Sequence, residues 1–514
     1  MTRLLLVWGV LGLSALLLAA AGQGAASAQP ISLQEQIDRA QPGDTLTIEG
    51  GVYNERIVID KPLTLTGSHN PVIDGGGGGD IVTITADDVT FSRFTIRNSG
   101  RAVSQEPAAI KVIDAHAPTI SHNRIESAHF GIHVTGTHHA TIDGNEIDLG
   151  DTSIERRGHA IYFWEVGESA VHDNVVSRAG DGIHLEFSQD NDILYNTVSD
   201  SRYALHFMYS DNNRIIKNDF NDNLSGAVLM FSHELLLKDN LLSNNRRGAT
   251  GAGILLKDVD NIFVEGNTVT RNKYGLTADG APQSEGATAI FIRNLFALND
   301  TGLGLMSNAP ITFVENSMIE NTVQIEALGG SLADPHAAAS WPPPAMAPAG
   351  EHEGHQSGTV IGSLPAAPAT SAHATWSLGG RGNYWSDYGG YDANGDGVGD
   401  QAYMPRPAFA GALDENPTLR FFQFTLAHEA IEAAAEMLPV YRYEPVIEDR
   451  APLMAPVGPA LPSETGPNSS LLAVSALLLV LAAALLQMTL DFDPLAFVLR
   501  RGHHIRRDAK GGAS

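Results

Sequence analysis

The sequence predicts an all-β fold, namely a right-handed parallel β-helix with coils of about 22 residues. Three observations support this: a repeat with a base period of 22 residues, an asparagine at a fixed place in each repeat, and alternation of apolar and polar residues. The composition agrees, because 52 of the 514 residues are glycine and aromatic residues make up only 7%. Such a composition suits many short strands and turns better than a helical bundle.

The repeat is a motif of the form x-N-x-apolar that recurs nine times along the middle of the chain. Successive asparagines are 22, 29, 22, 22, 22, 27, 27 and 22 residues apart. This period is too short for a pair of helices but accommodates three short strands with their turns. In a stack of coils, each asparagine amide can bond the next copy and satisfy buried turn backbone. The asparagines are Asn123, Asn145, Asn174, Asn196, Asn218, Asn240, Asn267, Asn294 and Asn316.

Each repeat also contains a small residue followed by alternating apolar residues, as in the segment 182–186. If Ile183 and Leu185 point into the coil, His184 and Glu186 point outward. Adjacent coils of a β-helix lie about 4.8 Å apart. The same register predicts an outward stripe with the rungs His133/Thr135, Tyr162/Trp164, His184/Glu186, His206/Met208, Val228/Met230, Leu255/Lys257, Thr277/Asp279 and Gly304/Met306.

The stripe contains candidate metal ligands. His184, His206, Met208 and Met230 fall on neighbouring rungs, and His233 follows at the next turn. Imidazole nitrogen with thioether sulfur is a ligand set for copper, particularly Cu(I). The chain has no cysteine, which excludes disulfides, thiolate zinc sites and iron–sulfur clusters. Packing beneath a loop or a partner is the alternative interpretation of these methionines and aromatic residues.

Carbohydrate binding or modification is the alternative function. Glycosidases use two carboxylates within about 5–10 Å of each other. The stripe offers Glu186 and Asp279, four rungs or about 19 Å apart. The segment 334–336 resembles the DPHD motif of alginate epimerases only in part, because Ala337 replaces the last aspartate. We therefore expect no enzyme, and the net charge of −27 argues against nucleic-acid binding.

The N-terminus predicts export. Residues 1–28 resemble a signal peptide, with Arg3 before an apolar stretch and a small-residue cleavage site at 26–28. An uncleaved anchor is the alternative. We expect the exported body to be periplasmic.

The C-terminus predicts a membrane anchor. Residues 469–490 form an apolar stretch long enough to cross a bilayer as one helix. A proline-rich spacer at 456–468 precedes it, and the basic tail at 491–514 is expected to be cytoplasmic. The protein would thus be anchored in the inner membrane, unless the stretch is a buried core helix.

Between these ends we expect the β-helix at 29–330, with a short capping helix over Gln34–Arg39. Residues 331–376 form a His/Pro/Ala-rich insertion, either a solvated linker or a segment that captures a soft metal loosely. Residues 377–455 form a C-terminal extension of the β-helix with an amphipathic helix at 425–438.

The extension contains an Asp/Gly-rich loop. Asp392, Asn394, Asp396 and Asp400 match the first nine positions of a calcium-binding loop. Tyr403 stands where a bidentate glutamate is expected. The loop is thus either a calcium site or a Gly/Asp-rich turn.

Several longer motifs resemble a known family, the nitrous oxide reductase maturation protein NosD. The similarity covers about residues 31 to 455, and its specific parts are the LHFMYS and NYWSDY segments. The motifs are RYALHFMYSDNNRIIKNDF, AVLMFSHELLLKDN, GILLKDVDNI, GNYWSDYGGYDANGDGVGD and AIEAAAEMLPVYRYEPVIEDRAPLM.

The resemblance implies a periplasmic β-helix that works with an ABC transporter, formed by an ATPase and a permease. It also implies a role in building the copper centres of nitrous oxide reductase, with copper received from a lipoprotein chaperone. This favours copper at His206, Met208, Met230 and His233, which lie in the matching motifs. A metal-free scaffold for the transporter remains the other interpretation.

Overall fold

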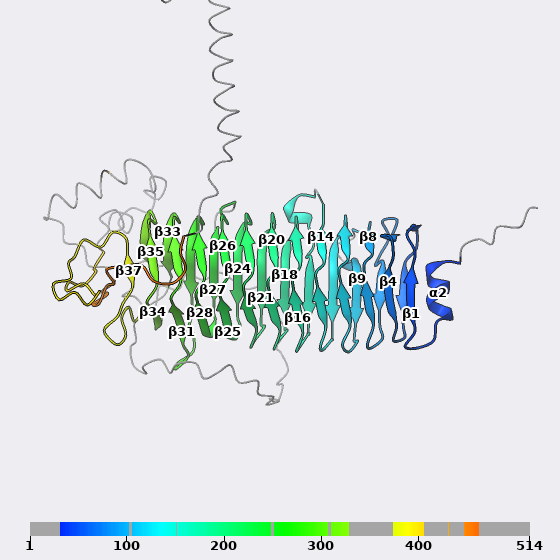
Figure 1. The fold of residues 1–514 in the computed structure, drawn as a ribbon, viewed down its shortest axis with the longest axis horizontal. Helices are drawn as coiled ribbons and strands as arrows, with labels where there is room; N and C mark the ends of the chain where they lie inside the picture. The colour runs from blue at the N-terminus through cyan, green and yellow to red at the C-terminus, as the bar shows by residue number, and fades with distance from the viewer. Residues whose placement is uncertain are drawn as a thin grey trace, which may run out of the picture. The chain divides into compact units, whose positions relative to one another are not determined.

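The computed structural model describes residues 31–101, 105–150, 152–247, 251–306, 310–327, 374–405, 430 and 447–461. Their strands form three parallel sheets, which we name A, B and C. Within each sheet the strands follow one another along a common axis (Figure 1). The chain passes through A, B and C in turn and then advances by one rung. This confirms the prediction of an all-β fold of the parallel β-helix type.

Many strands of sheets A and B have three residues, and the central one is buried in the core. Sheet A contains β1 (Thr45–Ile48), β4 (Thr64–Gly67), β7 (Thr90–Ser92), β10 (Thr119–Ser121), β13 (Thr141–Asp143), β16 (Ala170–His172), β19 (Asp192–Leu194), β22 (Arg214–Ile216), β25 (His233–Lys238), β28 (Asp260–Glu265), β31 (Ala289–Ile292) and β34 (Ile311–Val314). Sheet B contains β2 (Val52–Tyr53), β5 (Val72–Asp74), β8 (Thr95–Arg97), β11 (Arg124–Glu126), β14 (Glu146–Asp148), β17 (Val175–Ser177), β20 (Thr197–Ser199), β23 (Asp219–Asn221), β26 (Leu241–Ser243), β29 (Thr268–Thr270), β32 (Leu295–Ala297), β35 (Ser317–Ile319) and β37 (Tyr384–Trp385).

Sheet C contains many of the longer strands, several of them six residues long. Its members are β3 (Ile57–Ile59), β6 (Val82–Ile84), β9 (Ala108–Ile113), β12 (Phe130–Thr135), β15 (Ile161–Trp164), β18 (Asp181–Glu186), β21 (Tyr203–Met208), β24 (Ser225–Met230), β27 (Ala252–Lys257), β30 (Tyr274–Asp279), β33 (Thr301–Leu305) and β36 (Val323–Ala327). The helical turn η2 (Ile154–Arg156) lies in the connection from sheet B to β15.

The predicted asparagine ladder is present and buried. The side-chain oxygen of Asn196 accepts bonds from the backbone and side-chain nitrogens of Asn174, at 3.0 Å each. Its own Nδ2 donates to Val171 O at 2.8 Å and to Asn218 Oδ1 at 3.0 Å. The same pattern joins all nine predicted asparagines and continues to Asn383. From Asn123 onward, the ladder therefore satisfies the backbone at one turn of each coil with bonds from the protein itself.

The two ends of the β-helix are covered differently (Figure 1). Helix α2 (Leu33–Arg39) caps the first coil as predicted, and the hydroxyl of Ser32 accepts a bond from the backbone of Glu35. At the other end, the NYWSDY segment supplies β37, where Trp385 is buried and stacks on Tyr403 at 4.4 Å. This motif is therefore part of the end of the solenoid.

Several predictions concern residues outside the described ones. They are the signal peptide at 1–28, most of the insertion at 331–376, the helix at 425–438 apart from Ala430, and the spacer, span and tail beyond Leu461. Among the described residues, no helix is long and apolar enough to cross a membrane. The C-terminal anchor remains a prediction.

Candidate metal site on sheet C

The outward stripe has the predicted register. Strands β12, β15, β18, β21 and β24 pair so that His133, Tyr162, His184, His206 and Val228 form one column. A second column, two residues further along each strand, contains Thr135, Trp164, Glu186, Met208, Met230 and Lys257. Figure 1 shows β18, β21 and β24 side by side in the middle of the solenoid.

The two columns are less exposed than an outward direction suggests. His184 is only 7% exposed, and its ring stacks on His206 with centroids 4.4 Å apart and planes 18° apart. The ring of Tyr162 covers the other side of His184 at 5.0 Å. The histidines therefore lie in an aromatic column that shields them from water.

Asp181 lies at the start of β18 and organises the cluster. It is fully buried, and Arg202 donates to both of its carboxylate oxygens at 2.8 Å. Burial alone would raise the pKa of Asp181, but the surrounding histidines and Arg202 outweigh burial and hold this pKa well below the usual range. The group is thus a carboxylate that can only accept hydrogen bonds.

This carboxylate fixes the orientation of His206. Nδ1 of His206 lies 2.9 Å from Asp181 Oδ2, so Nδ1 must carry the proton and donate it. The lone pair of neutral His206 is then on Nε2, across the ring from Asp181. Carboxylates that orient a histidine in this way commonly support metal-ligating imidazoles.

A second chain of contacts runs from Asp181 to His184. Nδ1 of His159 lies 3.4 Å from Asp181 Oδ2, and its Nε2 lies 3.4 Å from His184 Nδ1. The backbone N–H of Asp181 donates to His159 Nδ1 at 3.3 Å. Nδ1 of neutral His159 is thus an acceptor, so its Nε2 carries the proton and faces His184 Nδ1.

Nε2 of His184 offers a lone pair to a metal in the tautomer that carries its proton on Nδ1. The atom is buried and has no hydrogen-bond partner. Burial lowers the pKa of His184 well below its ordinary value, and it lowers the pKa of His159 to about 4. Both rings are therefore neutral near pH 7, as a metal ligand must be.

The second column contains two methionines next to the histidine column. Met208 and Met230 are direct neighbours across β21 and β24, and both are half-buried. His206 and Met208 are two residues apart on one strand, so their Cα atoms are about 6.6 Å apart. Glu186, the next residue in the column, accepts a bond from the Tyr162 hydroxyl at 3.0 Å. Burial raises the pKa of Glu186.

His233 is not brought together with these residues. It begins β25 on sheet A, and its Nδ1 lies 3.1 Å from Asp211 while its Nε2 lies 3.9 Å from Asp260. The chain changes sheets after Met230, so the strand alternation that places Met230 does not extend to His233. The predicted common neighbourhood therefore excludes His233.

The predicted calcium loop lies apart from sheet C, in the exposed segment around residue 395. The carboxylate of Asp392 accepts backbone bonds from Gly395 and Gly397, at 2.7 and 2.9 Å, and Asp400 accepts one from Ala393 at 2.6 Å. Asn394 and Asp396 bond each other at 3.0 Å. These bonds form the turn without an ion, so calcium stays a prediction.

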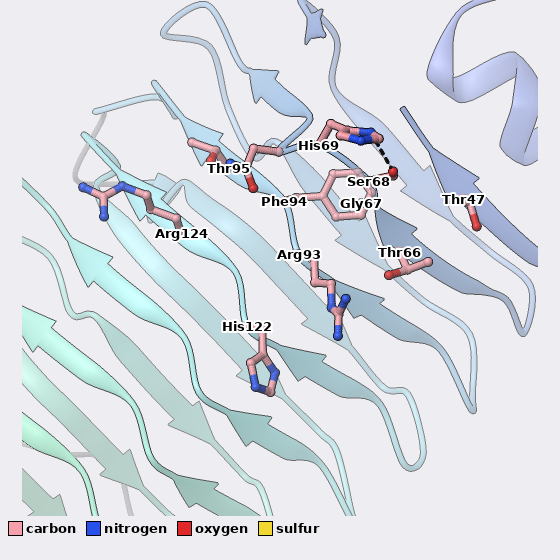
Figure 2. Close-up of a pocket in the computed structure, with 11 residues that line it drawn as sticks. Thr47, Thr66, Gly67, Ser68, His69, Arg93, Phe94, Thr95, His122 and Arg124 are labelled. Atoms are coloured by element: carbon pink, nitrogen blue, oxygen red, sulfur yellow. Dashed lines mark hydrogen bonds between the residues drawn. The ribbon is translucent and has the colours of Figure 1, made fainter. Parts of the chain in front are cut away.

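A hollow of about 600 Å³ lies at the corner of sheets A and B on the first coils (Figure 2). Its lining includes Arg93, Arg124, His69 and His122, all labelled in Figure 2, and Arg124 begins β11 directly after the turn that holds His122. Nδ1 of His69 lies 2.9 Å from the hydroxyl of Ser68. The two histidines are exposed, in contrast to the buried rings of sheet C, and the hollow is separate from that cluster.

Asp181, His159 and Arg202 were missed by the sequence reasoning. The inward–outward alternation of side chains that starts at Ile183 does not hold at Gly182. This residue lies at a corner of the coil, where a Cβ atom would point inward and meet Val198 at 2.3 Å. Asp181 therefore faces outward, out of step with the strand. The strand register could have indicated this contact, because it pairs Asp181 with Tyr203 and so brings the preceding Arg202 close to Asp181.

The donor set fits a soft cation. His184 and His206 offer imidazole nitrogens, one of them buried without a partner, and two methionines lie in the adjoining column. Asp181 is already bonded by Arg202 and His206, so its role is to position the histidines. Imidazole nitrogen and thioether sulfur are ligand types that Cu(I) favours.

Fold and site together define a class: a parallel β-helix with a buried histidine cluster beside paired methionines on one outer face. The family described as "Periplasmic copper-binding protein (NosD)" matches residues 149–390, which include the whole cluster. A relative from Pseudomonas aeruginosa, named "Probable ABC transporter binding protein NosD", is 34% identical over 430 residues, 81% of this chain and 92% of that protein. The chain belongs to the NosD family.

A protein of the same name from Stutzerimonas stutzeri is 40% identical over 79 residues, 15% of this chain and 18% of that protein. Among solved structures, the catalytic domain of a GH87 α-1,3-glucanase in complex with nigerose is similar with a TM-score of 0.48 and 12% identity. The similarity covers 59% of this chain and 66% of the glucanase chain.

Proposed function

We propose that this protein binds Cu(I) with His184, His206, Met208 and Met230 and passes it on without catalysing a reaction. The observation that carries the proposal is the buried, unpartnered Nε2 of His184, held in a neutral ring that stacks on His206. A purely structural ring in this position would leave a nitrogen unsatisfied at a cost of about 1–3 kcal/mol. A copper ion supplies the missing partner.

Family membership indicates where the copper goes. We propose that the protein is periplasmic, anchored in the inner membrane by residues 469–490, and associated with an ABC transporter permease and its ATPase. It would receive copper from a lipoprotein chaperone and deliver it for the copper centres of nitrous oxide reductase. The name of the Pseudomonas aeruginosa relative, a transporter binding protein, supports the transporter link. Calcium at Asp392–Asp400 would stabilise the exposed loop only.

The test is anaerobic titration of the purified full-length protein with Cu(I) against a chromogenic Cu(I) chelator. The double substitution Met208→Leu and Met230→Leu keeps the apolar volume and removes both sulfur atoms. We expect it to weaken Cu(I) binding at least about tenfold, by analogy with losses at metal sites. Met306→Leu is the matched control, since Met306 is exposed and lies further along the solenoid. Equal affinity in the double variant and the wild type would overturn the site.

Carbohydrate modification is the second candidate, and a described observation weighs against it. Glu186 and Asp279 are four rungs apart in the register, and Asp279 bonds Lys257 at 2.8 Å. Asp181 is held by Arg202. If the protein is retained on polysaccharide columns and does not bind Cu(I), carbohydrate modification becomes the preferred function. If it binds neither polysaccharide nor Cu(I), a metal-free scaffold is favoured.

A further inference from the structure

Sheet A carries a second cluster of metal-ligand side chains, separate from the histidine column of sheet C. Asp143 ends β13 and His172 ends β16, and the register makes them direct neighbours on adjacent coils. Asp173 follows His172 at the turn to sheet B, and His122 occupies the same turn two coils earlier. The four side chains therefore come from three successive coils.

The donor atoms of three of these residues converge. Nδ1 of His172 lies 3.2 Å from Asp143 Oδ1 and 3.0 Å from Asp173 Oδ2, and the three ligand atoms all lie within 4.8 Å of one another. In a tetrahedral zinc site with bonds of about 2.0–2.2 Å, neighbouring donor atoms are about 3.3 Å apart. The two contacts of His172 therefore have the length of an edge of a zinc tetrahedron.

The two carboxylates of this cluster have no permanent cation beside them. Nδ1 of His172 carries at most one hydrogen, so it cannot fully satisfy Asp143 and Asp173 together. Within the described part of the chain, no lysine or arginine bonds either carboxylate. By contrast, Asp192 on the next coil is paired with Arg214. A divalent cation would bond both carboxylates at once.

His122 can complete the ligand set. Its Nδ1 lies 3.8 Å from Asp143 Oδ2, the oxygen that His172 does not contact. Gly144 leaves room for its ring between the coils, because a Cβ atom there would meet His122 Nε2 at 3.2 Å. The side chain of His122, labelled in Figure 2, is 62% exposed, so it can turn toward an ion without disturbing the core.

We propose that Asp143, His172, Asp173 and His122 form a Zn(II) site that links three successive coils of sheet A. Imidazole nitrogen and carboxylate oxygen are zinc ligands, and four protein ligands make a site of the structural type. On binding, Nδ1 of neutral His172 gives up its hydrogen and Nε2 takes one up, so the ring stays neutral. This inference does not rest on the proposed function, because none of the four ligands belongs to sheet C.

The test is titration of the full-length protein, freed of metal, with Zn(II) against a fluorescent zinc chelator. We expect the Zn(II) stoichiometry to fall by one per chain in His172→Gln and to keep the wild-type value in His139→Gln. His139 is the matched control because it is an exposed histidine that contacts a single carboxylate, that of Glu168, at 3.0 Å. Asp173→Asn should weaken the same ion at least about tenfold.

The outcomes separate the zinc site from the copper site. Equal Zn(II) stoichiometry in His172→Gln and the wild type overturns the site, and so does a wild type that binds no Zn(II). Cu(I) binding should be the same in His172→Gln as in the wild type, and a parallel loss of Cu(I) would contradict a separate zinc site. If His172→Gln does not fold, the exposed substitution Asp173→Asn decides, because an unchanged zinc affinity in that variant overturns the inference.

Discussion

The asparagine ladder and the histidine column run through the same coils, but they differ in whether their buried polar atoms have hydrogen-bond partners. Asn196 bonds the copy before it and the copy after it, so its amide is satisfied by repetition. His133 and His184 share a column with Tyr162, which offers neither ring a hydrogen bond, and each keeps a buried nitrogen without a partner. In a solenoid, uniform columns thus provide stability, and we propose a binding site where a column breaks this uniformity.

The largest expected effect comes from breaking the ladder. Asn196→Ala leaves the buried backbone N–H of Asn174 and the carbonyl of Val171 without partners, which should lower the free energy of unfolding by about 4 kcal/mol. Asn221→Ala is the control, because that half-exposed amide bonds only the Asp219 side chain. Chemical denaturation measures both, and equal losses would refute the role of the ladder.

Asp181→Asn removes the charge that positions the histidines. We expect a loss of about 3 kcal/mol in unfolding free energy, because a buried ion pair is broken. Copper affinity should also fall about 10–100-fold, since His206 loses the group that orients it. Asp192→Asn breaks an exposed pair with Arg214 and should cost at most about 1 kcal/mol. A Cu(I) titration that gives the same affinity for both variants would contradict the positioning role.

His133, whose Nδ1 has no hydrogen-bond partner, should also change how the free energy of unfolding of the copper-free protein depends on pH. Burial lowers the pKa of His133 from 6.5 to about 4, so the folded state prefers the neutral ring. The unfolded chain binds the extra proton between these values, and stability present above pH 6.5 is lost as the pH falls towards 4. The contribution is about 3 kcal/mol. The difference in unfolding free energy between His133→Phe and the wild type should shift by this amount over that range, and a constant difference would argue against a buried neutral His133.

The smallest effect concerns the aromatic stack beside the methionines. Tyr209 lies between Phe187 and Phe231, with ring centroids 5.4 and 5.1 Å away. Tyr209→Ala should lower the unfolding free energy by about 1 kcal/mol. Tyr195→Ala, at a similar left-handed turn position with only a Lys217 contact, should cost less. Thermal denaturation measures both variants. Equal decreases of the unfolding midpoint in the two would show that the stack does not contribute to stability.

The sequence allowed the repeat, the asparagine ladder, the register of the stripe and the capping helix to be predicted, because each depends on a constant period. It did not reveal that His184 is buried, because alternation predicts the direction of a side chain and not what covers it. It also missed Asp181, which directly precedes the corner at Gly182, and it grouped His233 with Met230 across a change of sheet. These features depend on three-dimensional contacts between coils.

The most direct test of the account is copper K-edge X-ray absorption on the full-length protein loaded anaerobically with Cu(I). The account predicts both nitrogen and sulfur in the first shell, with the sulfur lost in the Met208→Leu, Met230→Leu variant and kept in Met306→Leu. It also predicts loss of nitrogen when His184 and His206 are both replaced by phenylalanine. A first shell without sulfur in the wild type, or one that the methionine variant leaves unchanged, would contradict it.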